Sequence, residues 1–143
     1  MKIALIHSLD FAQEAIEIRK KLQQVGHEVS ECYSVTKISK GDLSVQKVKD
    51  MKEFGNFSDY TISKDLIKWN YERIKKDDAI LVLNFDKKGI KNYIGGNTLL
   101  EIGFAYVLEK KIFFWNDIPD MFYTDELKAM QPVVIKQKLI LIK

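Results

Sequence analysis

A nearly continuous apolar run, Ala79–Phe85 (Ala-Ile-Leu-Val-Leu-Asn-Phe), constrains the fold of this chain more than any other feature. The run is short for a helix and does not alternate with polar residues, so it predicts a central strand covered on both faces. Lys2–His7 and Lys111–Trp115 are similar runs, and Glu28–Tyr33 and Leu139–Ile142 are two further strand candidates. Strands of this kind are typical of parallel sheets with helices on both sides.

Segments with the apolar spacing of a helix separate these runs. They are Phe11–Val25, Ile62–Lys76, Asn97–Glu109 and Tyr123–Met130. This alternation predicts an α/β fold, a Rossmann-like (flavodoxin-like) three-layer sandwich whose mostly parallel sheet has about five strands. The crossovers should be right-handed, and ligands of such sheets bind beyond the carboxyl ends of the strands.

The chain has 143 residues, so we expect one domain over residues 1–143. Residues 34–61 interrupt the alternation, because they are polar and rich in lysine and serine. Val45–Lys52 has the spacing of a short helix within this stretch. A connection this long predicts an insertion or a lid, with an ordinary surface excursion as the alternative.

Composition excludes several classes of function. The single cysteine, Cys32, rules out an internal disulfide framework, and the two histidines, His7 and His27, argue against a zinc enzyme with several histidine ligands. The 23 basic residues are nearly balanced by 20 acidic ones, which gives no indication of nucleic-acid binding. No dinucleotide motif follows the first strand, and there is no Walker sequence and no membrane-length apolar run. We therefore predict a cytoplasmic protein without a metal, a cofactor, a membrane partner or a nucleic-acid partner.

One carboxylate stands out on physical grounds. Glu101 is the only charged residue between Lys91 and Glu109, and its neighbours one helical turn away include Phe104 and Ala105. This pattern predicts a half-buried carboxylate, whose pKa burial would raise and helix N-terminal amides would lower. A rim glutamate that only satisfies backbone groups is the alternative.

The residues before Glu101 are typical of a ligand-binding turn. Gly95-Gly96-Asn97-Thr98 places two glycines before a helix, where the backbone can approach a ligand and amides are free. Gly103 lies inside the helix at a cost of about 1 kcal/mol relative to alanine, which predicts close packing or ligand approach. With the residues at the predicted strand ends and in the loop after the central strand, the substrate-binding candidates are His7, Ser8, Asn84, Tyr93, Gly95, Gly96, Asn97, Thr98, Trp115 and Asn116.

The region from Asp78 to Ile112 resembles the nucleoside 2-deoxyribosyltransferase-like superfamily, which includes the deoxynucleoside 5′-monophosphate N-glycosidases. In that family a hydrophobic strand is followed by Glu-hydrophobic-Gly-aromatic-Ala, matched here by Glu101–Ala105. The resemblance implies that Glu101 attacks the anomeric carbon and forms a covalent deoxyribosyl intermediate, which water or a second base then resolves. It also implies a small nucleoside or nucleotide as partner and a homodimer or larger homo-oligomer.

The chain departs from this family at several positions. Glu109 replaces a usual glycine, and Asn70 stands where family members often have an aspartate that assists departure of the base. An amide cannot protonate a base but can hydrogen-bond to one, and Asp86 is the candidate substitute acid. The first loop lacks the glycine of the monophosphate hydrolases, and Asp10 at a helix N-terminus would repel phosphate, which argues against a monophosphate preference.

Two hypotheses follow from these residues. The first is cleavage or transfer of an N-glycosidic bond through Glu101, with Asn70 or Asp86 aiding the leaving group. The second is a non-catalytic nucleotide or nucleotide-sugar sensor that kept the pocket, which the missing aspartate favours. Gly-Gly-Asn-Thr-x-x-Glu also resembles the motif of the lysine-decarboxylase-like cytokinin phosphoribohydrolases, which act on the same class of bond but have a third glycine. A purely structural or interaction role is a further alternative.

Overall fold

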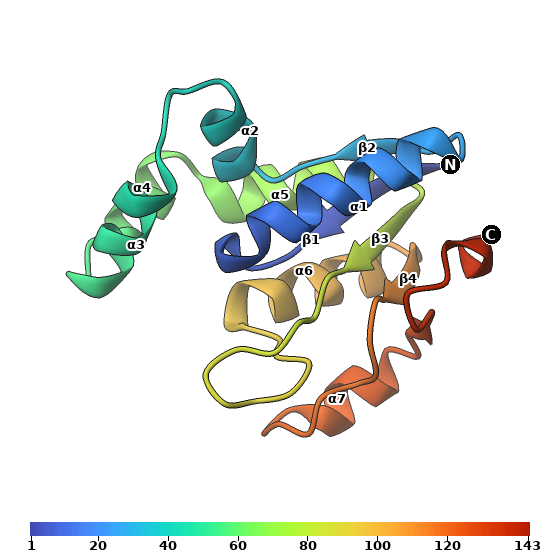
Figure 1. Ribbon diagram of the computed structural model, residues 1–143. Helices are drawn as coiled ribbons and strands as arrows, with labels where there is room; N and C mark the ends of the chain where they lie inside the picture. The colour runs from blue at the N-terminus through green and yellow to red at the C-terminus, as the bar shows by residue number, and fades with distance from the viewer.

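The computed structural model describes residues 1–143 and shows a parallel five-stranded sheet between two layers of helices (Figure 1). The strand order is β2-β1-β3-β4-β5, and every neighbouring pair is parallel. This is the flavodoxin-like order, so the predicted fold class is confirmed. The strands are β1 (Lys2–Ile6), β2 (Glu28–Ser30), β3 (Ala79–Val82), β4 (Lys111–Phe114) and β5 (Val133–Val134).

The helices divide between the two faces of the sheet. Helix α1 packs on one face together with the C-terminal segment, and α5, α6 and α7 pack on the other. Right-handed crossovers require this division, because the chain moves one way from β1 to β2 and the opposite way from β2 through β3 to β5. The helices are α1 (Ala12–Gln24), α2 (Tyr33–Ser39), α3 (Val45–Glu53), α4 (Phe57–Ser63), α5 (Leu66–Lys75), α6 (Gly96–Val107) and α7 (Thr124–Ala129), with 3-10 turns η1 (Leu9–Phe11) and η2 (Leu139–Leu141).

The central strand has the environment that its sequence predicts. All four residues of β3 are fully buried, because side chains that alternate in direction enter the two separate cores. Ala79 pairs with Ile3 of β1 and with Lys111 of β4, which aligns the carboxyl ends of the three middle strands. Polar residues that follow these ends are thereby brought to one edge of the sheet.

Two predicted elements are wrong. Leu139–Ile142 is not a strand: it contains η2, and Ile142 covers the α1 face of the sheet, while Val133–Val134 forms β5. The predicted helix Ile62–Lys76 is divided, because Asp65 adopts a left-handed backbone (φ 48°) between α4 and α5. A short apolar run fits a strand or a segment that covers the sheet equally well. The spacing of apolar residues also does not show where a backbone angle interrupts a helix.

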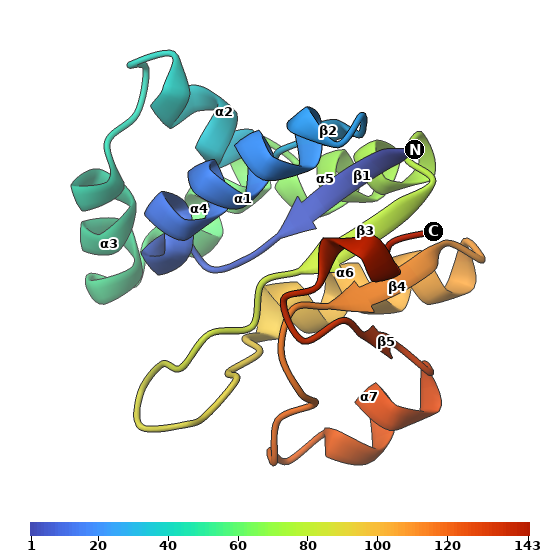
Figure 2. The same cartoon turned by 45° about the vertical axis from the view of Figure 1, so that its right-hand side comes forward.

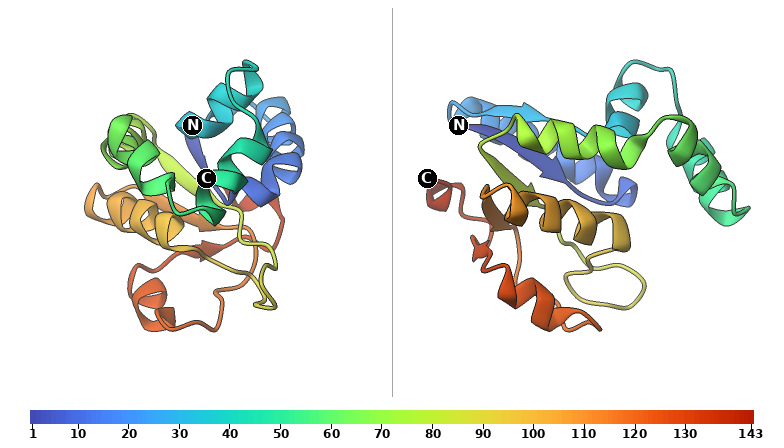
Figure 3. Two further views of the ribbon diagram at one scale, coloured as in Figure 1. Left: turned by 90° about the vertical axis from the view of Figure 1, so that its left-hand side faces the viewer. Right: turned by 180° about the vertical axis from the view of Figure 1, so that it is seen from behind.

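The polar stretch over residues 34–61 forms most of α2, α3 and α4. Only the helix over α3 was predicted there. Figures 2 and 3 show that α3 and α4 project beyond the sheet at the end where the loop after β3 also lies, and that both chain termini lie at the opposite end. No helix of the protein combines the length and the apolar character needed to cross a membrane.

Candidate active site

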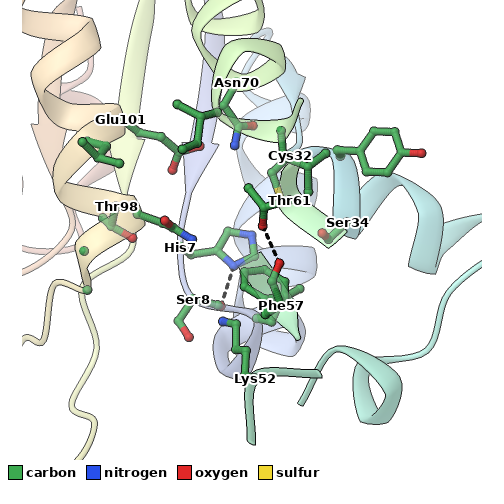
Figure 4. Close-up of a pocket in the computed structure, with 18 of the residues that line it drawn as sticks. His7, Ser8, Cys32, Ser34, Lys52, Phe57, Thr61, Asn70, Thr98 and Glu101 are labelled. Carbon is green, nitrogen blue, oxygen red and sulfur yellow. Dashed lines mark hydrogen bonds between the residues drawn. The ribbon is translucent and has the colours of Figure 1, made fainter. Parts of the chain in front are cut away.

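A cavity of about 270 Å³ opens at the carboxyl ends of β1 and β3. The strand order reverses here, because β2 lies on one side of β1 within the sheet and β3 lies on the other. Such a reversal is the usual ligand position in these folds. Helices α5 and α6, the α2–α4 segment and the loop after β3 form its walls (Figure 4). The structure brings these sequence-predicted residues together in its lining: His7, Ser8, Asn70, Tyr93, Gly95, Gly96, Asn97, Thr98 and Glu101.

Glu101 lies on α6 and forms a buried ion pair with Arg73 of α5. Arg73 Nη2 donates to Glu101 Oε1 at 3.3 Å, and both residues are only 8% exposed. Arg73 Nη1 also donates to the backbone oxygens of Leu5 and Ser30, each at 3.3 Å, so the guanidinium is anchored to β1 and β2. Arg73 was not among the residues predicted from the sequence, although its spacing of three residues from Asn70 places both on one side of α5.

Two opposing effects act on the Glu101 carboxyl group. Burial raises its pKa, and the charges of Arg73 and His7 lower it. The effect of burial on this pKa was predicted from the sequence. The opposing effect was expected from helix N-terminal amides rather than from these two side chains. Close packing does not explain Gly103, because a Cβ atom there would have no neighbour within 4 Å.

His7 is held at the end of β1 by oxygen atoms on both sides of its ring. Nδ1 lies 2.8 Å from the backbone oxygen of Ser8, and Nε2 lies 3.4 Å from Glu31 Oε2. Arg19 Nη1 is 3.9 Å from the other oxygen of Glu31, so the contact extends to α1. Neither nitrogen of His7 is free for a ligand in this arrangement, and its contribution at Glu101 is electrostatic.

Asn70 projects from α5 into the cavity (Figure 4). Its Oδ1 atom is buried without a hydrogen-bond partner. A buried polar atom without a partner is costly and is normally satisfied by protein or by a bound group. Asn70 therefore offers an open hydrogen-bonding position one turn of α5 from Arg73.

Four predicted site residues lie outside the cavity lining. Asp86, proposed as a general acid, instead accepts a hydrogen bond from the Asn92 backbone amide at 2.8 Å and closes its own loop. Trp115 is buried in the core on the α1 side. Asn84 and Asn116 bond to each other: Asn84 Oδ1 accepts from the backbone N–H of Asn116 at 2.9 Å, and Asn116 Nδ2 donates to the backbone oxygen of Asn84 at 3.0 Å.

Replacement of Asn84 by alanine is expected to destabilise the fold by about 2–3 kcal/mol, because its buried amide joins the ends of β3 and β4 and its partners would be left unsatisfied. Urea unfolding of wild type and variant measures the change. Ligand binding by the folded fraction should stay unchanged, since Asn84 does not line the cavity. Full stability with weakened ligand binding would contradict this structural assignment.

Three lysines that sequence analysis did not select line the mouth of the cavity: Lys52, Lys87 and Lys88. Lys87 Nζ lies 2.8 Å from both Ser8 Oγ and Asp10 Oδ2. Asp10 is therefore paired with a cation that the sequence did not reveal, and the expectation that it disfavours phosphate in the first loop stays a prediction. No sequence signal identified these lysines, because the loop and α3 bring them together only in the tertiary structure.

No group of three or more histidine, cysteine, aspartate or glutamate side chains could hold a metal ion.

No family model matches the chain, and no curated protein matches its sequence. Among solved structures, the chain is similar to the CMP N-glycosidase BcmB of Clostridium botulinum, with a TM-score of 0.47 and 16% sequence identity over 94% of this chain and 85% of that one. This likeness concerns the course of the chain and assigns no residue a role.

Proposed function

We infer that the protein is an enzyme that cleaves or transfers the N-glycosidic bond of a nucleoside or nucleotide-like small molecule, with Glu101 as its nucleophile. The observation that supports this most is the position of Glu101. It is the only carboxylate that lines the cavity, and Arg73 contacts one of its oxygens. An ionised carboxylate in a low-dielectric site stabilises the positive charge that develops at an anomeric carbon.

The reaction proceeds in two steps. An oxygen of Glu101 forms a bond to the anomeric carbon while the carbon–nitrogen bond breaks, and the electron pair leaves with the base nitrogen. The base takes a proton from water at the cavity mouth, and Asn70 hydrogen-bonds to the base as it leaves. Water then attacks the anomeric carbon, frees Glu101 and loses a proton equivalent to the one the base gained; a second base in place of water gives transfer.

The thiol in the lining is a poor alternative nucleophile. Cys32 borders the cavity, but burial raises the pKa of its thiol to about 11. The thiol is therefore protonated at neutral pH, and a protonated thiol is a weak nucleophile. Glu101 remains the better nucleophile.

A second candidate function is ligand sensing without turnover. One observation favours it: the cavity lining contains no carboxyl group besides Glu101, whereas retaining glycosidases usually employ two. In this case Asn70 and Glu101 would recognise a bound nucleotide, and the buried ion pair would orient the carboxylate.

A product screen distinguishes the two functions. Purified protein is incubated with pooled nucleosides and deoxynucleoside monophosphates, with and without a free acceptor base, and products are identified by mass spectrometry. We expect released base, and we expect the release to be lost in the Glu101→Ala variant. Dependence on the acceptor base would indicate a transferase. No release by protein that is folded by circular dichroism would overturn the enzymatic proposal in favour of sensing.

A further inference from the structure

Four lysine side chains and a single carboxylate lie near the mouth of the cavity. Asp10 Oδ2 is 2.8 Å from Lys87 Nζ, and Asp10 Oδ1 is 3.7 Å from Lys49 Nζ. Lys52 and Lys88 also contribute positive charge here, and Lys52, Lys87 and Lys88 all line the cavity. One negative charge is thus set against four positive charges in a chain that is otherwise nearly balanced.

The pKa shifts of these groups reflect the same excess of positive charge. Burial lowers the pKa of Lys52, the charges of Lys87 and Lys88 lower it further, and the charge of Asp10 raises it. A hydrogen bond from Lys87 lowers the pKa of Asp10, and the nearby lysines add to that effect. A single carboxylate does not neutralise this group, whereas a doubly charged anion would relieve the repulsion among the lysines.

Two of the donors in this region are in direct contact. Lys87 Nζ contacts Ser8 Oγ at 2.8 Å, so ammonium and hydroxyl groups lie side by side. Figure 4 shows the Lys52 ammonium group pointing toward Ser8, with His7 between this region and Glu101. The cavity therefore has two chemically different ends: a buried carboxylate at one and a group of cations at the other.

We propose that Lys52, Lys87 and Ser8 bind the phosphate monoester of a nucleotide, and that Asp10 occupies this anion position as an internal competitor while the cavity is empty. Binding exchanges the Asp10–Lys87 contact for a phosphate contact, so Asp10 reduces the affinity for phosphorylated ligands. The assignment to a nucleotide rests on the proposed function, since it places the sugar between these cations and Glu101.

Equilibrium binding tests the proposal without requiring turnover. Isothermal titration calorimetry of the Glu101→Gln protein uses the four deoxynucleoside 5′-monophosphates, their parent nucleosides and inorganic phosphate. At least one monophosphate should bind about tenfold or more tightly than its nucleoside, because hydrogen bonds to a charged group are worth roughly 1.4 kcal/mol or more. The advantage should decrease as salt is added.

Three single substitutions in that background separate the roles of the residues. Lys87→Gln should remove most of the monophosphate advantage, whereas Lys91→Gln, in the same loop but outside the lining, should preserve it. Asp10→Asn should strengthen monophosphate binding by roughly threefold or more, because it removes the competing charge. Binding of the parent nucleoside should change little in each variant.

Several results would overturn the proposal. They are equal affinity for monophosphate and nucleoside, an unchanged advantage in Lys87→Gln, or weaker monophosphate binding in Asp10→Asn, which would mean that Asp10 orients Lys87 rather than competes. Inorganic phosphate binding as tightly as every monophosphate would overturn the assignment to a nucleotide. A retained monophosphate advantage with no base release by the wild type would refute the proposed catalysis while supporting this binding position.

Discussion

Replacement of Glu101 by glutamine is expected to lower the rate of base release by a factor on the order of 10³ or more, because an amide cannot form the glycosyl ester. Glutamine has nearly the same shape and keeps an oxygen that can accept from Arg73. The loss is measured as kcat/KM on the best substrate of the product screen. Glu109→Gln is the matched control, since Glu109 is exposed beyond the C-terminal end of α6 and does not line the cavity.

The same substitution has a consequence for stability that separates chemistry from folding. Removal of one partner leaves the buried Arg73 charge uncompensated, so Glu101→Gln should lower the free energy of unfolding by roughly 2–3 kcal/mol. Adding Arg73→Met should recover part of this loss without restoring base release. Activity of Glu101→Gln close to that of the wild type would refute the nucleophile assignment, and a rate loss that only matches the unfolded fraction would show that glutamine impairs folding alone.

Replacement of Arg73 by methionine is expected to move the acid limb of the activity profile to higher pH. Burial raises the pKa of Glu101, and Arg73 acts against that effect. Without Arg73 the pKa of Glu101 rises further, so less of the carboxyl group is ionised at a given pH on the acid limb and activity there falls. At sufficiently alkaline pH the carboxylate is again ionised, and kcat should approach the wild-type value.

The pH profile distinguishes positioning from a purely structural contribution. Arg73→Met should also destabilise the protein by about 3 kcal/mol, because it leaves the Glu101 carboxylate and two backbone oxygens without a donor. Arg73→Lys keeps the charge and should return the acid limb toward its original position, even if one backbone contact is lost. An unchanged pH profile in folded Arg73→Met protein would contradict the role assigned to Arg73.

Much of the fold follows from local patterns in the chain. The continuous apolar character of Ala79–Phe85 required a strand covered on both faces, and the structure buries every residue of β3. The last strand did not follow, because Leu139–Ile142 is as apolar as an edge strand but instead covers the sheet as η2. Choosing between these outcomes depends on which surface is left uncovered, and that depends on the remainder of the fold.

The candidate site was predictable where neighbours in sequence are neighbours in space. Gly95, Gly96 and Thr98 lie beside Glu101 because all belong to the first turns of α6 or immediately precede it. Asp86 and Asn84 were predicted at the site only because they follow β3. Asp86 instead bonds within its own loop, and Asn84 bonds to the segment that follows β4. Position at a strand end therefore brings a side chain to the correct edge without deciding its direction.

The parallel α/β architecture and the unusual position of the Glu101 carboxylate could be predicted from sequence, because both depend on periodicity within short segments. The partners of that carboxylate and the charge at the cavity mouth could not, because they depend on long-range packing. Arg73 reaches Glu101 because α5 packs beside α6, and Lys87 reaches Asp10 because the loop after β3 lies against η1. These contacts join residues that are distant in sequence, and their energies depend on burial and distance, which local sequence patterns do not specify.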